Sequence, residues 1–378
     1  MIKIIEVKNR KDRKEFLNFP LRMYKDNPNF VPPLYADEKK MFTKKFAYND
    51  TCESAFFLAE KDGKTVGRIS AIIQKAANEK NNERRVRFTR FDCIDNEEVA
   101  KALFGAIEEY AAKNGMDTIC GPLGYSDLER EGLLIEGFDE LSTFEEQYNA
   151  EYYGRLIEAC GYKKEVDWVE SKIFLPEEKD IENIKKMSAF VKNRYGLRLP
   201  KCKNIKEFID KYADGFFDLL DDAYKDLYGT VPFSDSMKKM LMVNFKLVID
   251  IKHVTVVLNE KDEIVCLGLC FPSIGKALQK SGGKLTVPAL LKVLKAIKKP
   301  EIVDLGLIAV RADYLNCGVT AILAEGIIDL LKQDGVEYAE TNLNLEDNHA
   351  VQNLWKRFKG ERHKRRRAYV KTLEKKSD

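Results

Sequence analysis

Two stretches in the C-terminal third of the sequence combine residue types that could hold an anion and move a proton. In the first, AVRADYLNCGVTAILAEGII, Gly318 stands two residues before Thr320, where an apolar helical repeat begins. Backbone N–H groups at a helix start carry partial positive charge, and glycine lets a phosphate approach the backbone closely. We therefore expect a phosphate site made by the amides of Asn316, Cys317, Gly318, Val319 and Thr320. The alternative is that Gly318 only permits close packing of the helix on a sheet.

The second stretch, YAETNLNLEDN, repeats polar side chains at alternate positions. If it is a strand, Glu340, Asn342 and Asn344 share one face, because successive strand residues point to opposite faces. A carboxylate in such a place can take a proton from an amine, so Glu340 is the first candidate for a general base, with Glu346 and Asp347 behind it. A carboxylate that only forms an ion pair with a nearby Lys or Arg is an equally good interpretation.

The elements that must position these residues form a repeat. Both halves of the sequence show, in the same order, a strand hairpin, a strand, a helix, a strand, a second helix and a final strand. Asn149 and Asn348 are expected to open the second helix of each half. The expected elements are 55–73, 86–94, 96–115, 116–122, 148–162 and 168–175 in the first half, and 254–274, 301–310, 315–335, 336–345, 347–360 and 367–373 in the second.

The repeat predicts two domains, residues 1–175 and 184–378, on either side of a charged stretch with a proline. A length of 378 residues fits two domains of about 100–200 residues each. The second half also contains an extra segment, GKALQKSGGKLTVPALLKVLKAIKKP (275–300), with the pattern of a basic amphipathic helix. We expect its Leu, Val and Ile side chains to face the core, in preference to a role at a membrane surface.

The order of elements, with two helical segments before each hairpin, resembles the GNAT (Gcn5-related N-acetyltransferase) superfamily, here in two tandem copies. Several segments resemble a bacterial family of uncharacterised GNAT-like proteins: YKDNPNFVPPL, GKTVGRISAII, GLLIEGFD with YNAEYYGRLIEACGY, and LEDNHA. The resemblance spans nearly the whole chain. It implies an α/β class, a tandem duplicated acyl-CoA N-acyltransferase fold with a mixed sheet, acetyl-CoA or another acyl-CoA as co-substrate, and no metal.

In that superfamily the turn after the fourth strand reads Arg/Gln-x-x-Gly-x-Gly/Ala and binds the pyrophosphate of CoA. Here the pattern falls on Leu315, Gly318 and Thr320, so only the middle glycine is kept. The matching turn of the first copy, DNEEVAKAL, has no glycine, and its carboxylates would repel phosphate, so we expect CoA only in the second copy. Further cofactor contacts implied by the resemblance are Ile308, Val310 and Asn348.

The resemblance implies transfer of an acyl group, most simply acetyl, to an amine of a small molecule or peptide. Such a reaction needs a base for the amine and an acid for the leaving thiolate. The superfamily's usual Tyr acid aligns with Trp355, whose indole is only a weak donor. Tyr338, Tyr314 or a water would have to act as the acid beside the base Glu340, and the sequence does not select among them. Two other functions remain open: peptidyl transfer from aminoacyl-tRNA, and non-catalytic ligand binding.

A long polar segment of the first copy, residues 121–153, is too elaborate for a simple connection, and loops of this length often carry function. We expect it to line a substrate cleft. An equally good alternative is that its apolar residues, 133–135 and Phe138, fill a domain interface while its polar groups satisfy the turns. The candidate cleft residues are Tyr125, Ser126, Glu131, Asn149 and Tyr153, with Asn342 and Asn344 from the second copy.

Composition argues against several other classes. The eight cysteines lack a CxxC pair and the three histidines lack metal-site spacing, so we expect reduced thiols and no metal. The sequence has no apolar run near ~20 residues and no apolar leader at its N-terminus, which indicates a cytoplasmic protein without a membrane partner. A net charge of +3 is too small to predict a nucleic-acid partner, and we expect one only as tRNA in the peptidyl-transfer hypothesis. The basic run 356–367 could attract CoA phosphates, tRNA or another polyanion, or it is a solvated surface. We expect a monomer or homodimer.

Overall fold

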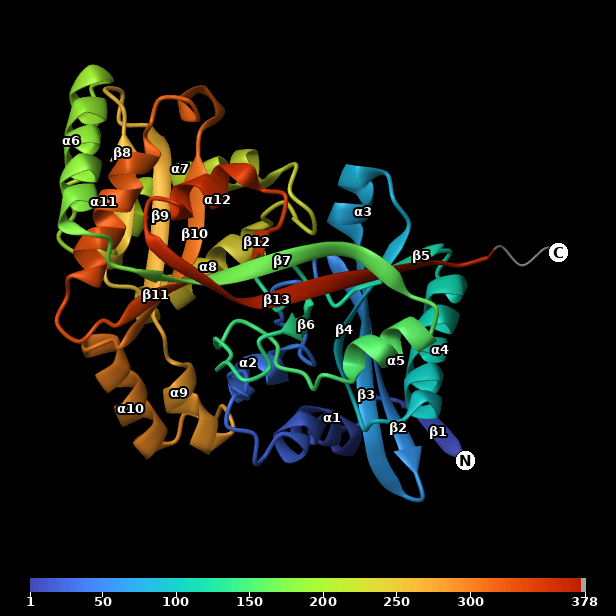
Figure 1. Cartoon of the computed structure of the whole chain (residues 1–378). Helices are drawn as coiled ribbons and strands as arrows, with labels where there is room; N and C mark the ends of the chain where they lie inside the picture. The colour runs from blue at the N-terminus through green and yellow to red at the C-terminus, as the bar shows by residue number, and fades with distance from the viewer. Residues whose placement is uncertain (375–378) are drawn as a thin grey trace. The chain divides into compact units, whose positions relative to one another are not determined.

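The computed structural model describes residues 1–374, which form two compact α/β units (Figure 1). Neither unit is continuous along the chain. The first contains Met1–Trp168, Gly275–Ala289 and the described residues after 363. The second contains Val169–Ile274 and Leu290–His363. The chain therefore returns to the first unit twice after leaving it.

The first unit is built on a mixed sheet in the strand order β1-β2-β3-β4-β5-β13. Neighbouring strands are antiparallel except β4 and β5, which are parallel. The β2–β3 hairpin closes at Asp62 and Gly63, whose φ angles are 52° and 73°, a backbone that glycine takes without strain. The strands are β1 (Ile2–Glu6), β2 (Cys52–Lys61), β3 (Lys64–Gln74), β4 (Arg85–Cys93), β5 (Thr118–Gly121), β6 (Leu133–Glu136), which pairs with β13, and β13 (Lys359–Thr372).

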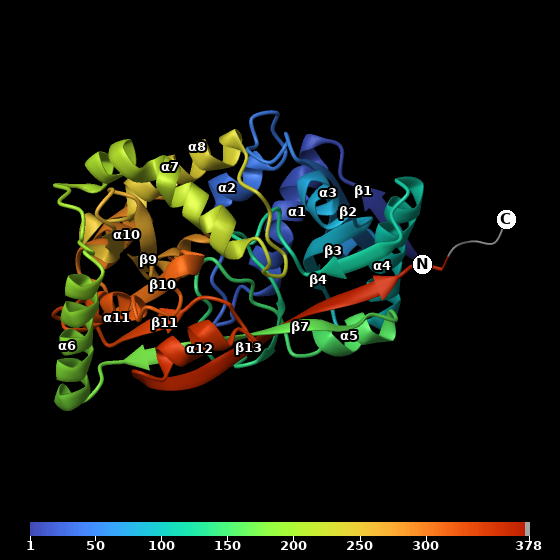
Figure 2. The same ribbon diagram turned by 90° about the horizontal axis from the view of Figure 1, so that it is seen from above.

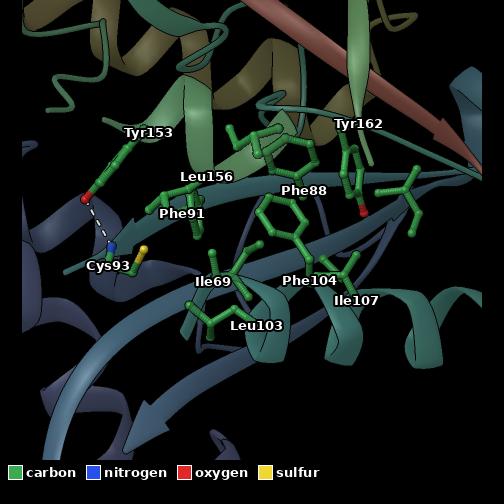
Figure 3. Packing of buried hydrophobic residues seen from close by; sticks show 14 of the residues in the cluster. Ile69, Phe88, Phe91, Cys93, Leu103, Phe104, Ile107, Tyr153, Leu156 and Tyr162 are labelled. Carbon is green, nitrogen blue, oxygen red and sulfur yellow. Dashed lines mark hydrogen bonds between the residues drawn. The ribbon is translucent and has the colours of Figure 1, made fainter. Parts of the chain in front are cut away.

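Helix α4 (Glu97–Lys113) covers one face of this sheet. It begins where the Asn96 side chain accepts the N–H of Val99, and Gly115 follows its end with a φ of 71°. Its apolar residues recur every three or four positions, so they share one face and pack on the strands (Figure 3). The core drawn there includes Ile69, Phe88, Phe91, Leu103, Phe104, Ile107 and Leu156. The other helices of this unit are α1 (Arg10–Met23), α2 (Tyr35–Lys40), α3 (Lys75–Asn81) and α5 (Tyr153–Ala159).

The second unit repeats this plan in the strand order β7-β11-β10-β9-β8. Again one pair, β10 and β11, is parallel, and the other neighbours are antiparallel. Helices α7 and α8 lie over one face of the sheet, and α6 and α11 lie over the other (Figure 2). The strands are β7 (Lys163–Phe174), β8 (Val254–Leu258), β9 (Ile264–Pro272), β10 (Ile302–Val310), β11 (Tyr338–Thr341) and β12 (Asn344–Leu345). The helices are α6 (Glu178–Arg194), α7 (Ile205–Tyr224), α8 (Asp235–Val248), α11 (Thr320–Leu331) and α12 (His349–Trp355), with 3₁₀ turns η1 (Ile251–His253) and η3 (Ala312–Tyr314).

The final strands of the two halves are exchanged between the units. Residues 369–372 of β13, from the end of the chain, pair with β5 of the first unit. Ile173 and Lys172 of β7, from the first half, pair with β11 of the second unit. Each half therefore completes the sheet that the other half begins. The expected domain boundary near residues 175–184 stays a prediction.

The two asparagines expected to open equivalent helices behave differently. Asn348 is the N-cap of α12, and its side chain accepts the N–H of Val351 at 3.3 Å. Asn149 does not start a helix, because α5 begins at Tyr153. Its side chain instead bonds both the N–H and the carbonyl of Leu134, at 2.8 and 3.0 Å. The repeat is therefore closer in strands than in helix starts.

The extra segment of the second half forms α9 (Gly275–Leu278), η2 (Gln279–Ser281) and α10 (Val287–Lys298). Val293 of α10 is buried, as expected. The expectation that the other apolar side chains of this helix face the core is wrong for Val287, Leu290, Leu291 and Leu294, all of which are exposed. Within residues 1–374, none of the helices is both long and apolar enough to cross a membrane.

Candidate functional site

The parallel pairing between β10 and β11 stops before the end of β10. The register between them stops at Leu305 and Thr341, and β10 continues to Val310 in register with β9. On the edge that β11 leaves, the hydroxyl of Tyr224 from α7 donates to the Ile308 carbonyl at 2.9 Å and accepts its N–H at 3.2 Å. Two backbone groups of β10 are thus satisfied by a side chain instead of a strand. No pattern in the sequence pointed to Tyr224.

A β-bulge lies at the point where the strands part. The register of β10 against β9 shifts between Leu305 and Leu307, so Gly306 is the extra residue. A Cβ at Gly306 would lie 2.4 Å from a ring carbon of Phe271, so the close approach of this ring requires glycine. The bulge redirects the end of β10 as it leads into the turn before α11.

That turn carries the residues predicted to bind phosphate. Gly318 has a φ of 75°, which lets the chain turn into α11 without strain. The Cys317 N–H donates to the Tyr314 carbonyl at 3.1 Å, so it is used within the turn. Across residues 1–374, the N–H groups of Gly318, Val319 and Thr320 donate to no backbone or side-chain acceptor. Three amides at a helix start therefore remain as donors.

The start of α4 in the first unit has the opposite character. Its first turn contains Glu97 and Glu98, and the Asn96 side chain already accepts an amide there. The first turn of α11 holds no acidic residue and has no side-chain cap. Because carboxylates at a helix start compete with an anion, the start of α11 offers phosphate a more favourable field than the start of α4.

Two buried carboxylates lie side by side just before the strands part. Asp304 of β10 is the register partner of Glu340 of β11, and each is 4% exposed. The Glu340 carboxylate lies 3.2 Å from Nε2 of His363, and Lys172 of β7 is its register partner on the other side. Adjacent residues Val303, Leu305 and Ala339 pack in the core with α11, so the carboxylates share the opposite face.

Sequence reasoning selected Glu340 but missed Asp304 and His363. Asp304 interrupts the apolar run IVDLGLIAV, and a charged residue in a buried strand was the signal available. His363 lies in the basic run, and no local pattern links it to Glu340. A carboxylate in contact with an imidazole can hold and pass on a proton, so the arrangement is suited to general base chemistry.

Comparison with known proteins identifies the architecture. A solved structure described as a tandem GNAT protein from the clavulanic acid biosynthesis pathway (without AcCoA) aligns over 100% of both chains, with a TM-score of 0.56 and 11% identity. The chain has a tandem GNAT fold. No family model matches the sequence. Over 97% of the chain it is 26% identical to Protein YghO of Escherichia coli (strain K12), covering 94% of that protein. It is also 26% identical to the Bacterial ceramide synthase of Caulobacter vibrioides, over 98% of each.

Other predicted residues of the second GNAT copy lie around this site. Tyr338 is two residues before Glu340 on β11, and Nζ of Lys172 lies 5.6 Å from its ring centre. The strand ends at Thr341, so Asn342 follows it and Asn344 belongs to β12. The single face expected for Glu340, Asn342 and Asn344 therefore does not extend along one strand.

Trp355 stands where a tyrosine acid is usual in GNAT proteins. It is 7% exposed, and its Nε1–H donates to Oδ1 of Asn344 at 2.6 Å. The indole packs in the core beneath α11. Its observed contacts are those of a structural residue.

The five predicted cleft residues of the first GNAT copy are buried, none more than 4% exposed. Tyr125 accepts from Ser54, and Ser126 bonds to Tyr48. The Tyr153 hydroxyl lies 2.7 Å from that of Tyr24 and accepts the Cys93 N–H at 3.0 Å, as Figure 3 shows for the second bond. Burial raises the pKa of Glu131 and Tyr153 well above their usual values. A role in substrate binding for Tyr125, Ser126, Glu131, Asn149 and Tyr153 stays a prediction.

The last four residues of the basic run, 364–367, are held within the fold. Lys364 and Arg366 are 3% and 0% exposed. Arg367 binds Asp167 through two hydrogen bonds of 2.8 and 3.0 Å, and Arg365 also contacts Asp167. Burial raises the pKa of Asp167, but the bonds from Arg367 and Lys164 outweigh it and hold the pKa below the usual range. These four side chains are therefore poorly placed to bind a polyanion such as tRNA, whereas Lys356, Arg357, Lys359 and Arg362 of the same run are exposed.

Among residues 1–374, no group of three or more His, Cys, Asp or Glu side chains is placed to hold a metal ion.

Proposed function

We propose that the protein is an acyl-CoA-dependent N-acyltransferase that works through its second GNAT copy. The acyl group, acetyl in the simplest case, passes to an amine of a small molecule or peptide. The observation that carries this proposal is the set of three unused amides at Gly318, Val319 and Thr320, at the start of the helix that comes after β10 and the turn η3. A strand edge leading into a helix start suits a ligand with amides at one end and phosphates at the other.

Binding would use both parts of this surface. The pyrophosphate would accept hydrogen bonds from the backbone N–H groups of Gly318, Val319 and Thr320, where the helix dipole favours negative charge. The amide groups of the pantetheine arm would pair with Ile308 and Val310 on β10. Because the Tyr224 hydroxyl holds the Ile308 groups in this structure, it would have to move aside. Asn348, the N-cap of α12, is the further proposed contact.

Acyl transfer needs two proton movements at this site. The acceptor nitrogen bonds to the carbonyl carbon of the thioester, the carbon–sulfur bond breaks, and the nitrogen loses a proton to Glu340. His363, 3.2 Å from that carboxylate, can accept the proton and carry it away. The leaving thiolate takes a proton from Tyr338, with Tyr224 as the second candidate. CoA supplies the activated acyl group, and the protein supplies position and proton transfer.

The relative named Bacterial ceramide synthase suggests which amine to test first. A ceramide is a long-chain amino alcohol whose nitrogen carries an acyl group, so forming its amide by acyl transfer is a reaction of the proposed class. We propose a long-chain amino alcohol as the first acceptor to test, with acetyl-CoA and a long-chain acyl-CoA compared as donors.

Calorimetric titration with acetyl-CoA and CoA tests the proposal directly. Thr320→Asp adds a carboxylate to the first turn of α11, where it stabilises the helix but repels phosphate. We expect micromolar binding by the unaltered protein and at least about tenfold weaker binding by this variant. Gly318→Glu should also abolish binding, although its positive φ adds strain.

Gln333→Glu is the matched control, because it adds the same charge just past the far end of α11. Its affinity for CoA should equal that of the unaltered protein. Absence of CoA binding by the unaltered protein would overturn the proposed function. Equal weakening by Thr320→Asp and Gln333→Glu would show that charge alone, and not the helix start, controls binding.

A further inference from the structure

Helix α10 turns an apolar stripe away from the protein. Val287, Leu290, Leu291 and Leu294 are 74%, 43%, 63% and 52% exposed. Their spacing of three and four residues puts them on one face of the helix. Val293, 8% exposed, belongs to the face packed on the protein. A surface helix of a water-soluble protein normally has the reverse arrangement, with its largest apolar residues inward.

The surroundings of this stripe are strongly basic. Residues 275–300 contain seven lysines and no Asp or Glu, although the whole chain has a net charge of only +3. Lys292, Lys295, Lys298 and Lys299 on or just after α10 are all exposed. Lys295 lies one turn after Leu291, and Lys298 one turn after Leu294, so positive charge borders the apolar side chains.

We propose that α10 binds the surface of a lipid bilayer that contains anionic lipids. The Val and Leu side chains would enter the boundary between headgroups and acyl chains, and the lysines would contact lipid phosphates. At 12 residues the helix is too short to span a bilayer, so it lies in the plane of the interface. This combination of an apolar face and a lysine-rich flank is the pattern of interfacial helices.

Charge favours a membrane over a second copy of this chain. A symmetric contact of α10 with its equivalent would bring two lysine clusters together without an acid from the 275–300 segment to separate them. An anionic lipid surface neutralises the same lysines. The inference does not depend on acyl transfer, because it concerns residues outside the proposed CoA site.

Vesicle co-sedimentation of the full-length protein tests the proposal. We expect binding to vesicles of phosphatidylcholine with phosphatidylglycerol, weaker binding as salt rises, and little binding to phosphatidylcholine alone. The triple variant Leu290→Gln, Leu291→Gln, Leu294→Gln should bind at least about tenfold more weakly. The double variant Lys292→Glu, Lys295→Glu should lose the preference for anionic vesicles. All five side chains are exposed, so the fold should survive these changes.

Two control variants alter equally exposed residues on other helices. Met187→Gln, Phe190→Gln, Val243→Gln removes three exposed apolar side chains from α6 and α8, and Lys185→Glu, Lys186→Glu reverses two charges on α6. Both should bind vesicles like the unaltered protein. Failure of the unaltered protein to bind, or retained binding by the Leu triple variant, would overturn the proposal. So would a dimer that binds no vesicles and dissociates in the triple variant, because the stripe would then be an interface between copies.

Discussion

The carboxylate of Glu340 lies 3.2 Å from Nε2 of His363, although 23 positions and two further secondary-structure elements separate them in the chain. Glu340 lies on the sheet face opposite the α11 core, and Asp304 is its register partner on β10. The pair of Glu340 and His363 joins a residue chosen from the sequence to one that the sequence did not indicate, and it is the centre of the proposed chemistry.

Glu340→Gln should lower kcat by about 100-fold or more and leave CoA affinity unchanged, because an amide cannot take the proton from the acceptor. Release of free CoA thiol in the presence of a long-chain amino alcohol measures the rate. Glu346→Gln is the matched control, since this carboxylate is nearby in sequence and exposed. A larger loss in Glu346→Gln than in Glu340→Gln would assign the base to Glu346.

Tyr224→Phe removes the hydroxyl that bonds both backbone groups of Ile308. We expect the ligand-free protein to lose about 1 kcal/mol of unfolding free energy, because two polar groups lose a partner. CoA should bind more tightly, since no hydroxyl then has to be displaced from β10. Chemical denaturation and calorimetry measure the two effects. Weaker CoA binding would mean that the hydroxyl contacts the ligand itself.

Trp355→Phe removes the 2.6 Å hydrogen bond to Asn344 and leaves an aromatic ring in the core. We expect a loss of about 1–3 kcal/mol in unfolding free energy, from the lost bond and the smaller ring. The pH profile of kcat should keep its shape, because the indole donates no proton in the reaction. If kcat no longer fell at high pH in this variant, the assignment of Trp355 as a structural residue would be contradicted.

Asn348→Asp separates two roles of this residue. The carboxylate can still accept the Val351 N–H and suits a helix start, so thermal stability should be kept or slightly raised. If Asn348 also contacts CoA, as proposed, the added charge should weaken CoA binding several-fold. Unchanged CoA affinity would mean that Asn348 only caps α12 and does not contact CoA.

His253 makes stability depend on pH. It is 1% exposed, its ring nitrogens have no hydrogen-bond partner among residues 1–374, and burial, with Lys252 nearby, lowers its pKa to about 4. Since the unfolded pKa is about 6.5, the folded state takes up its proton less readily, and stability falls as pH drops below about 6.5 toward 4. We expect about 2 kcal/mol less unfolding free energy at pH 5 than at pH 7 from this group.

His253→Leu should remove most of that pH dependence in urea denaturation, and His349→Gln, at an exposed histidine, should not. Glu38 does not interfere at pH 5. Burial raises its pKa, but Arg90 outweighs this and brings the pKa to about 2, so its contribution is lost only as pH falls below about 4.5. An equal pH dependence in His253→Leu and the unaltered protein would contradict the assignment.

Several elements followed from local pattern. The predicted segment 96–115 contains α4, and the predicted hairpin 55–73 lies within β2 and β3. Such elements are set by nearby residues: an Asn cap at 96, apolar side chains at helical spacing, and a turn at Asp62 and Gly63 that permits positive φ. For the same reason the unused amides at Gly318–Thr320 were predictable, since a helix start is a local feature.

The orientation of α10 was not predictable from its own sequence. Its pattern defines an apolar face and a basic flank, but both a core-packed and a surface-bound helix satisfy that pattern. Ala289 and Val293, not the larger leucines, face the protein, and this choice depends on the elements that α10 meets. Asn149 is a similar case, because its bonds to Leu134 follow from a distant loop and not from helix capping.

By itself, the sequence determined the two matching sets of strands and helices, the contrast between the acidic start of α4 and the uncharged start of α11, and the basic character of residues 275–300. These depend on residue type and short spacing. Only the tertiary structure decided which strand completes each sheet, since β13 and β7 are exchanged. It also brought His363 to Glu340 and Tyr224 to Ile308, because contacts between distant residues depend on strand register and packing, which no local repeat encodes.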